Sequence, residues 1–432
     1  MTDLSTRRQA AYYLLLFGLL LSVVPRAGLP DDVGFWVRWA TYIFDNGLGN
    51  VYEVADNNYN PLYHYILWAY GKLAGSTQKI AYYQHALKGF TLLFDFAGAL
   101  WAASLVPDRR RRFGLALLLL LNFGYLYDTL IWEQVDAIYT CLAFGAVVLA
   151  LRQRPALSSA CYVLALSAKT QAIIFLPPLL LLWGPLWWAR PRWAGWAWGA
   201  GALTFLLIVA PFVWGGHQNF LPRIININLH TVDFAPKASM HCYNMWYLFL
   251  RSTDPYETPD DLSYLGLTYK YWGLLLFMLA SAAALLPLLL VAVKCLGRRA
   301  SLGSPAQAPA ALVLLSCGLL PLLFSFFNTQ MHERYWHASV LFLAAYGFVS
   351  RDYLPYVLVS VAYFLNLEAL LHFLGLQNYD DWFFQPAYIA GLFALAILVG
   401  FFRLYRRPEW RAASSQRLAK VPTPTLSLNA LS

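Results

Sequence analysis

The sequence predicts an all-α polytopic membrane protein, and three observations support this fold class. Of its 432 residues, 59% are hydrophobic and only 12% are charged, whereas a soluble domain carries about 25% charged residues. The apolar residues are grouped into Leu-rich blocks that are long enough to span a bilayer, which takes roughly 20 residues per helix. Because these blocks do not alternate with polar residues, they are expected to be helices and not the strands of a membrane barrel.

The basic residues predict how these helices are oriented, because they lie in short clusters between the apolar blocks, as in cytoplasmic loops. We therefore expect the net charge of +9 to reflect membrane orientation and not binding to nucleic acid. Placing every cluster on the cytoplasmic side gives about twelve membrane crossings with both termini inside. The expected helices cover about residues 10–24, 82–106, 113–128, 135–151, 156–168, 170–187, 193–214, 269–293, 308–327, 336–350, 353–373 and 383–402.

The N-terminus resembles a signal peptide, because Arg7 and Arg8 precede an apolar run over residues 10–24. The run is followed by Pro25 and Arg26 without a cleavage site of small residues, so we expect an uncleaved first helix. The five cysteines of the chain show neither the spacing of a disulfide framework nor that of a zinc site.

Three polar segments are expected to face away from the cytoplasm, namely residues 29–80, 215–268 and 328–335. Aromatic stretches in the first segment are expected to form helices that lie in the membrane interface. We expect these loops to belong to one transmembrane catalytic domain of residues 1–411, followed by a disordered cytoplasmic tail of residues 412–432.

Ionisable residues at the outer ends of the expected helices are the candidates for chemistry, because charge at membrane depth is costly. They are far apart in the chain, and yet the expected topology brings them to one membrane surface. Such a set suits the transfer of a sugar from a lipid phosphate, which needs one carboxylate as a base and cations that stabilise the phosphate. The residues are Asp32, Glu133, Asp136, Lys169, His332, Glu333 and Arg334.

Among these residues, Asp32 is the expected base. Arg334 is expected to bind the phosphate in a bidentate manner, with Lys169 or His332 adding charge or a donor. A glycosidase is disfavoured because it needs two carboxylates that flank the scissile bond. The neighbouring side chains of Asp31 and Asp32 point in different directions on a helix or a strand.

Several short motifs resemble those of the GT-C superfamily of membrane glycosyltransferases. Its members include the dolichyl-phosphate-glucose-dependent glucosyltransferases of N-glycan assembly, and the mannosyltransferases of GPI-anchor assembly with their bacterial relatives. In the glucosyltransferases an Asp is followed seven residues on by Trp, and Asp32 and Trp39 match this spacing. Four further segments resemble later motifs in the same order: Asn58-Tyr59-Asn60-Pro61-Leu62 resembles Asp-Tyr-Pro-Pro-Leu, Trp132-Glu133-Gln134-Val135-Asp136 resembles His-x-Gln-x-Asn, Lys169-Thr170 resembles Lys-Gln, and Gln330-Met331-His332-Glu333-Arg334 resembles His-x-His-Glu-Lys.

The resemblance implies a GT-C type bundle and an inverting transfer with Asp32 as the general base. It implies a donor-phosphate site that includes His332 and Arg334, to which the reasoning above adds Lys169, and it implies no divalent metal and no cofactor. The expected substrate-binding residues are Asn58, Tyr59, Gln134, Asp136 and Glu333. This chain departs from the motifs at four positions: Asn58 replaces an acidic residue, Asp136 replaces Asn, Gln330 replaces His and Arg334 replaces Lys. These departures leave the identity of the sugar and of the acceptor open.

The expected reaction moves a hexose, mannose or glucose, from a polyprenyl- or dolichyl-phosphate donor to a lipid-linked glycan, a glycolipid or a protein. The active site would face the periplasm or the lumen, and the Leu/Ala/Arg-rich composition favours a bacterial inner membrane over the ER membrane. A transporter or lipid flippase and a non-catalytic membrane assembly subunit stay open as alternatives.

Each candidate residue also has a purely structural interpretation. Asp32 is a favoured residue for a helix N-cap, and Lys169 can extend from a helix end to the interface. Glu133 with Asp136 can cap a helix, and the segment from His332 to Arg334 can form an ion pair at a helix start. Six other histidines are expected to be structural or stay unassigned, and they are His64, His85, His217, His230, His241 and His337.

Overall fold

The structure is a computed structural model, and it describes residues 6–22, 30–229, 236–297 and 308–407. Most of this part of the chain is helical, and its one pair of strands is a short hairpin in which β1 (Ser263–Tyr264) pairs antiparallel with β2 (Leu267–Thr268). The all-α prediction is therefore confirmed. The expected disordered tail, residues 412–432, lies outside the described residues, as do Pro25 and Arg26 after the first helix.

Helices occupy every segment for which the sequence predicted one. In chain order they are α1 (Thr6–Ser22), α5 (Lys88–Ser104), α6 (Arg109–Leu120), α7 (Phe123–Tyr127), α8 (Asp136–Leu151), α9 (Pro155–Ala168), α10 (Leu176–Ala189), α11 (Pro191–Trp214), α14 (Tyr269–Gly297), α15 (Ala310–Phe327), α16 (His337–Ser350), α17 (Leu354–Leu371) and α18 (Pro386–Arg406). The polar segments add further helices, namely α2 (Pro30–Asn46), α3 (Pro61–Ala74), α4 (Thr77–Tyr82), α12 (Leu221–Leu229) and α13 (Met245–Phe249).

Seven helices in the described part of the chain are long and apolar enough to cross a membrane, and an eighth crossing is possible if the bent pair α6–α7 is one span. Helices α8 and α9 are apolar but have only 16 and 14 residues. The chain is thus an all-α multi-pass membrane protein, and the expected count of about twelve crossings stays a prediction.

The third expected helix is not continuous, because the chain bends by 56° between α6 and the segment that begins with α7. Asn122 lies at the break, where its Oδ1 accepts a hydrogen bond of 2.9 Å from the backbone N–H of Tyr125. Its amide also donates to Tyr356 and Ser360 of α17, at 2.6 and 3.0 Å. The Asn122 side chain thus replaces the helical hydrogen bonds that end here.

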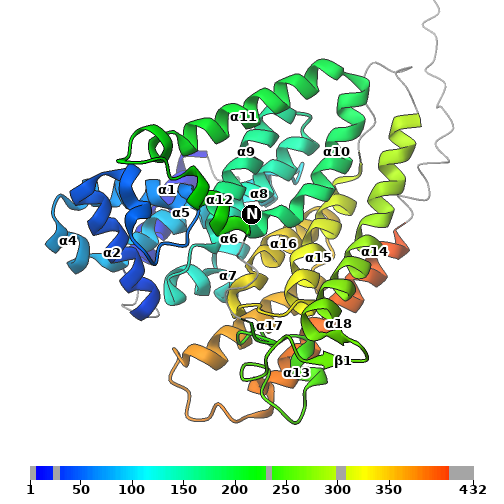
Figure 1. The fold of residues 1–432 in the computed structure, drawn as a ribbon. Coiled ribbons are helices and arrows are strands. Elements are labelled where there is room, and N and C mark those ends of the chain that lie inside the picture. The colour runs from blue at the N-terminus through cyan, green and yellow to red at the C-terminus, as the bar shows by residue number, and fades with distance from the viewer. Residues whose placement is uncertain (1–5, 23–29, 230–235, 298–307, 408–432) are drawn as a thin grey trace, which may run out of the picture.

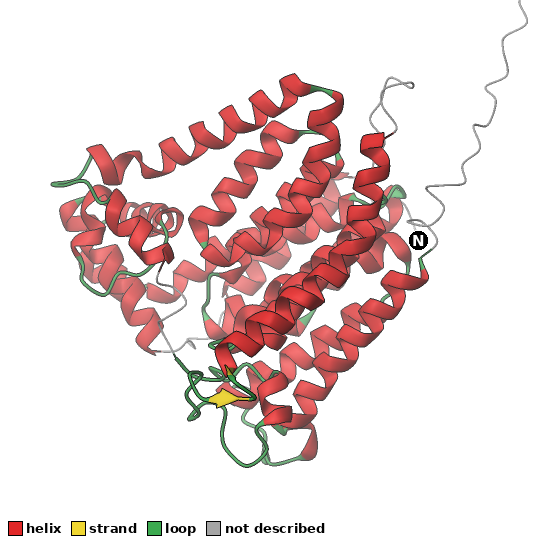
Figure 2. Cartoon of the chain, turned by 45° about the vertical axis from the view of Figure 1, so that its right-hand side comes forward, coloured by secondary structure: helices red, strands yellow, loops and turns green. Residues whose placement is uncertain are grey.

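The helices form one bundle in which α15 and α16 are enclosed and α11 lies along one edge (Figures 1 and 2). Of an 18-residue apolar stretch in each helix, 83% is buried in α15, whereas only 22% is buried in α11. The exposed side of α11 carries tryptophans such as Trp196 and Trp198, which suit a lipid-facing surface near the headgroups. Helices α2 and α4 lie at one side of the bundle, and α13 and β1 lie at its lower end in Figure 1.

Helices α5 and α8 pack closely at Gly145, and this contact can be tested by substitution. A methyl group at Gly145 of α8 would lie 1.8 Å from the ring of Trp101 on α5, so Gly145→Ala forces the two helices apart. Overpacking of this kind costs about 1–3 kcal/mol, and we expect the midpoint of thermal unfolding in detergent to fall. Gly199→Ala in α11 is the control, because a methyl group there meets nothing within 4 Å. Equal midpoints for the two variants would contradict this packing.

Candidate functional site

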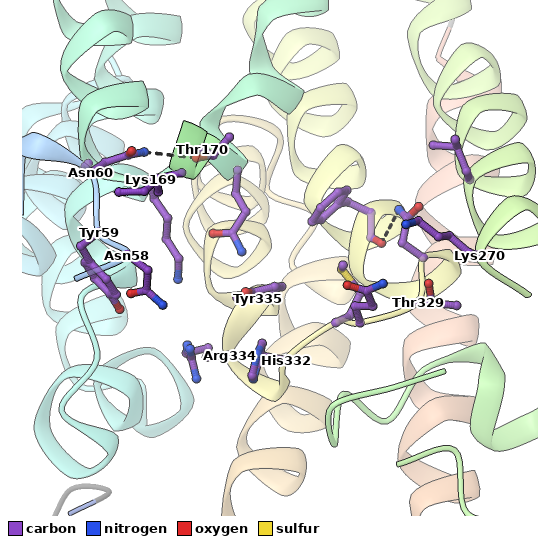
Figure 3. A pocket seen from close by; sticks show the side chains of 18 of the residues that line it. Asn58, Tyr59, Asn60, Lys169, Thr170, Lys270, Thr329, His332, Arg334 and Tyr335 are labelled. Carbon is purple, nitrogen blue, oxygen red and sulfur yellow. Dashed lines mark hydrogen bonds between the residues drawn. The ribbon is translucent and has the colours of Figure 1, made fainter. Parts of the chain in front are cut away.

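A pocket of about 490 Å³ opens where five separate segments meet (Figure 3). Its walls are the turn before α3, the residues that follow α9, the end of α12, the start of α14 and the turn between α15 and α16. Figure 3 shows Lys169, Arg334 and Tyr59 gathered at one end, with Lys270 and Thr329 at the other. The pocket is large enough for a small ligand, since such sites usually measure about 300–1,000 Å³.

One buried carboxylate holds the two cations at the first end. Asp136 is the first residue of α8 and is fully buried. Its Oδ1 lies 2.6 Å from the Nζ of Lys169, and its Oδ2 lies 3.6 Å from the Nε of Arg334. Arg334 also donates to Glu333 over 3.1 Å. Both cations line the pocket, so Asp136 and Glu333 balance their charge from outside the lining.

The ring of Tyr335 lies close to both of these cations. Its ring lies 4.9 Å from the Nζ of Lys169 and 5.8 Å from the guanidinium carbon of Arg334. A ring at this distance attracts a cation through its negative face. The tyrosine therefore restrains both side chains without adding a formal negative charge to the pocket.

His332 enters the pocket from the turn between α15 and α16, and the backbone of residues 240 and 241 pairs with it. Its Nδ1 lies 3.7 Å from Glu333. Burial lowers the pKa of His332 below the ordinary histidine value, and the neighbouring Arg334 lowers that pKa further. His332 is therefore neutral at pH 7 in the empty pocket.

The same turn is held by a carboxylate that the sequence analysis missed. Asp260, which is only 2% exposed, accepts hydrogen bonds from Thr329 at 2.8 Å and from Gln330 at 2.7 Å. Gln330 has a positive φ of 63°, so its conformation needs outside support. The segment around Asp260 reads as a solvated acidic loop in sequence, and nothing local indicates that one of its acids folds inward.

Asp32, the expected base, lies in the first turn of α2 and does not itself line the pocket. The side-chain amide of Gln134 donates to its Oδ2 over 2.6 Å. Tyr59, which does line the pocket, is close enough to interact electrostatically with Asp32, Asp136 and Arg334. Asp32 lies outside the lining, one helical turn before Trp36, whose ring contacts that of Tyr59 at 4.8 Å.

The structure brings the expected site residues into one neighbourhood, although it places them at two depths. Asp136 and Glu333 are one contact behind the lining, because Asp136 binds Lys169 and Glu333 binds Arg334, whereas Gln134 and Asp32 bind one another outside the lining. Glu133 points elsewhere and pairs with His85 and Lys88. The lining residues among those expected are Asn58, Tyr59, Lys169, His332 and Arg334.

An amide network joins Asn60 and Thr170, which line the pocket beside Lys169, to Asn228 of α12. Asn60 donates to Thr170 and to Asn228, each over 3.2 Å, and the Thr170 hydroxyl donates to Asn228 over 2.6 Å. These contacts join the turn before α3, the end of α9 and α12. Asn228 was not expected from the sequence, because an isolated asparagine in a polar segment carries no motif.

A second ionisable cluster lies inside the bundle, and the sequence analysis did not identify it. His337 lies 3.7 Å from Asp95 and 4.0 Å from Asp128, and all three side chains are fully buried. The ring of Tyr125 stacks on His337 at 5.0 Å. Asp95 lies inside an expected helix, whereas Asp128 and His337 lie at or next to the end of one. The available signal was therefore Asp95, an acid inside an apolar segment.

Comparisons with known proteins do not place the chain in a family. No family model matches it, and no curated protein matches it. Within the described residues, no group of three or more His, Cys, Asp or Glu side chains is arranged to hold a metal ion. The pocket is therefore interpreted from its own geometry.

The pairing of Asp136 with two cations gives a stability test. Asp136→Asn leaves Lys169 without its buried counter-charge and leaves Arg334 with Glu333 alone, and loss of one partner of a buried pair costs about 3–5 kcal/mol. We expect a lower unfolding midpoint in detergent. Adding Lys169→Met removes one unpaired cation, so the double variant is expected to regain part of the loss. A double variant less stable than Asp136→Asn would show that the pair does not act as a unit.

Proposed function

We propose that the chain is an inverting glycosyltransferase of the GT-C type. It moves a hexose, mannose or glucose, from a polyprenyl- or dolichyl-phosphate donor to a lipid-linked glycan, a glycolipid or a protein on the non-cytoplasmic side. The observation that carries the proposal is one pocket with two cations and an apolar wall, next to the first turn of α2 that carries Asp32.

The cationic end of the pocket suits a phosphate. Lys169 and Arg334 already face a carboxylate at hydrogen-bond or ion-pair distance, so they are arranged to hold anionic oxygens. Within the described residues the Nε of Arg334 is buried and makes no hydrogen bond. A bound phosphate would give this donor an acceptor, and the planar guanidinium favours two parallel bonds to one anion.

The remainder of the pocket suits a lipid. Its lining includes Ile227, Leu274, Phe324 and Met331, which offer apolar surface to a polyprenyl chain. Helix α14, which carries Leu274, exposes many leucines along its length, and only 33% of its apolar stretch is buried. A chain that leaves the pocket along this helix would stay in contact with hydrocarbon.

The transfer needs one base and no strong acid. In the proposed step, Asp32 accepts the proton of the acceptor hydroxyl as its oxygen forms a bond to the anomeric carbon. The bond from that carbon to the phosphate oxygen breaks, and the lipid phosphate leaves with the electron pair. Lys169 and Arg334 stabilise the charge that develops there. Gln134 occupies Oδ2 of Asp32, so Oδ1 takes the proton.

A second candidate function, a transporter or lipid flippase, is favoured by one observation. The cluster of Asp95, Asp128 and His337 lies fully buried within the bundle. Ionisable side chains in such positions are typical of ion or proton pathways. The glycosyltransferase proposal does not use this cluster, so the transfer assay below separates the two functions.

The base is tested by Asp32→Asn, which keeps the shape of the side chain and removes its basicity. We expect transfer of labelled mannose or glucose from polyprenyl-phosphate donors to membrane lipid to fall about 10²–10⁴-fold, while donor binding persists. Asp45→Asn is the matched control, because Asp45 is exposed on the same helix. Transfer at the wild-type rate in Asp32→Asn would contradict the assignment. No transfer by the wild-type chain with either donor would favour the transporter.

The phosphate site is tested by the pH dependence of donor binding. Neutral His332 sits beside the proposed phosphate, and a bound anion would raise its pKa above the lowered value of the empty site. Binding then takes up a proton, so donor affinity rises as the pH falls from about 7 towards 5, by up to about tenfold for each unit of pKa difference. His332→Gln is expected to abolish this slope. An unchanged slope in that variant would exclude His332 from the phosphate site.

A further inference from the structure

The turn before α8 is made by a residue in an unfavourable backbone conformation. A π-helical turn, Asp128–Trp132, ends at Glu133, which has φ 67° and ψ 36° in the left-handed region. Residues other than glycine seldom adopt this region, and those that do usually have a specific support. After Glu133 the chain changes direction, and three residues later α8 begins. Gln134 and Asp136 both follow that change, and they bind Asp32 and Lys169.

The support for Glu133 comes from helix α5 and the turn that precedes it. The Nζ of Lys88 donates to the backbone carbonyl of Leu130 over 2.8 Å and lies 3.5 Å from Oε2 of Glu133. The same carboxylate oxygen lies 2.8 Å from Nδ1 of His85. The Lys88 and Glu133 side chains are 0% and 2% exposed, so water screens this pair very little. Lys88 therefore holds the π-helical turn at two points, by a hydrogen bond to Leu130 and an ion pair with Glu133.

The contacts downstream of this anchor lead to the expected base. The backbone N–H of Gln134 donates to the carbonyl of Asp128 over 2.9 Å, which closes the turn. Its side chain then donates to Asp32 over 2.6 Å, and Gln134 is itself only 1% exposed. The described contacts thus run without interruption from Lys88 through Glu133 and Gln134 to the carboxylate of Asp32.

We infer that Lys88 and Glu133 are positioning residues that hold the Gln134 amide against Asp32. The kinetic part of this inference rests on the proposed function, whereas the geometric part does not. A buried ion pair is seldom more stabilising than apolar side chains of the same volume, so packing alone gives little reason for a lysine and a glutamate here. The pair lies where a strained turn must be fixed in one conformation.

The geometric part is tested by cross-linking. Cysteines are placed at both ends of the final contact, as Asp32→Cys with Gln134→Cys, and the yield of oxidative cross-linking is measured in membranes. We expect Lys88→Met to lower this yield several-fold, because the turn loses the hydrogen bond to Leu130 and the ion pair with Glu133. Arg403→Gln is the control, since it breaks another ion pair, 3.0 Å from Asp352, far along α18. The single-cysteine variants report any background from native cysteines.

The kinetic part uses Lys88→Met, Glu133→Gln and the double variant, each checked for a single symmetrical peak in size-exclusion chromatography. We expect each single change to lower kcat of sugar transfer about tenfold or more, with the KM for the donor changed less than about twofold. The double variant should be no slower than the worse single variant, because both residues act through one contact.

The outcomes separate the two proposals. A cross-linking yield in Lys88→Met equal to that in Arg403→Gln would overturn the positioning role, whatever the kinetics show. Effects on kcat that multiply in the double variant would also overturn it, because the two residues would then act independently. A cross-link that weakens in Lys88→Met while the wild-type chain transfers no sugar would support the positioning role and reject the proposed function.

Discussion

The arrangement of the pocket depends on one carboxylate that never reaches it. Asp136 is fully buried and binds Lys169 and Arg334, which come from segments far apart in the chain. Two cations without a counter-charge would repel one another in surroundings that screen charge weakly. The carboxylate allows them to approach, so the residues after α9 and the turn before α16 can line one pocket beside the start of α8. A ligand anion then enters a site whose charges are already in place.

A membrane helix that ends or breaks frees backbone groups, which are tolerated at membrane depth where they are buried in protein or line a cavity. The described chain does this repeatedly around the site. The π-helical turn at Asp128–Trp132 ends before Gln134, α9 ends at Ala168 before Lys169, and α15 ends before the turn that carries His332. Each interruption leaves a polar side chain at the end of an apolar helix. Asn122 shows the same principle in the bent pair, where a side chain satisfies the backbone.

The sequence allowed the helices and much of the site to be predicted, because both depend on strong local signals. Apolar blocks mark helices, and rare ionisable residues such as Lys169 and Arg334 stand out against them. The bend at Asn122 was not predictable, since it follows from contacts with Tyr356 and Ser360 of another helix. The inward turn of Asp260 was missed for the same reason, because its partners Thr329 and Gln330 lie far along the chain.

Two departures from the motifs that the chain resembles turn out to face one another. Asp136 stands where those motifs have Asn, and Arg334 stands where they have Lys, and the two side chains lie 3.6 Å apart. The Asn and Lys of the motifs carry one negative charge fewer than Asp136 and Arg334 of this chain, because Asn is neutral and Asp is charged. With Lys169 also bound to Asp136, the carboxylate keeps two cations together that an amide would leave repelling. Within the proposed GT-C assignment, the two departures therefore act as one change. The carboxylate of Asp136 joins that of Glu333 in supporting Arg334, whose planar guanidinium can bind an anion in a bidentate manner.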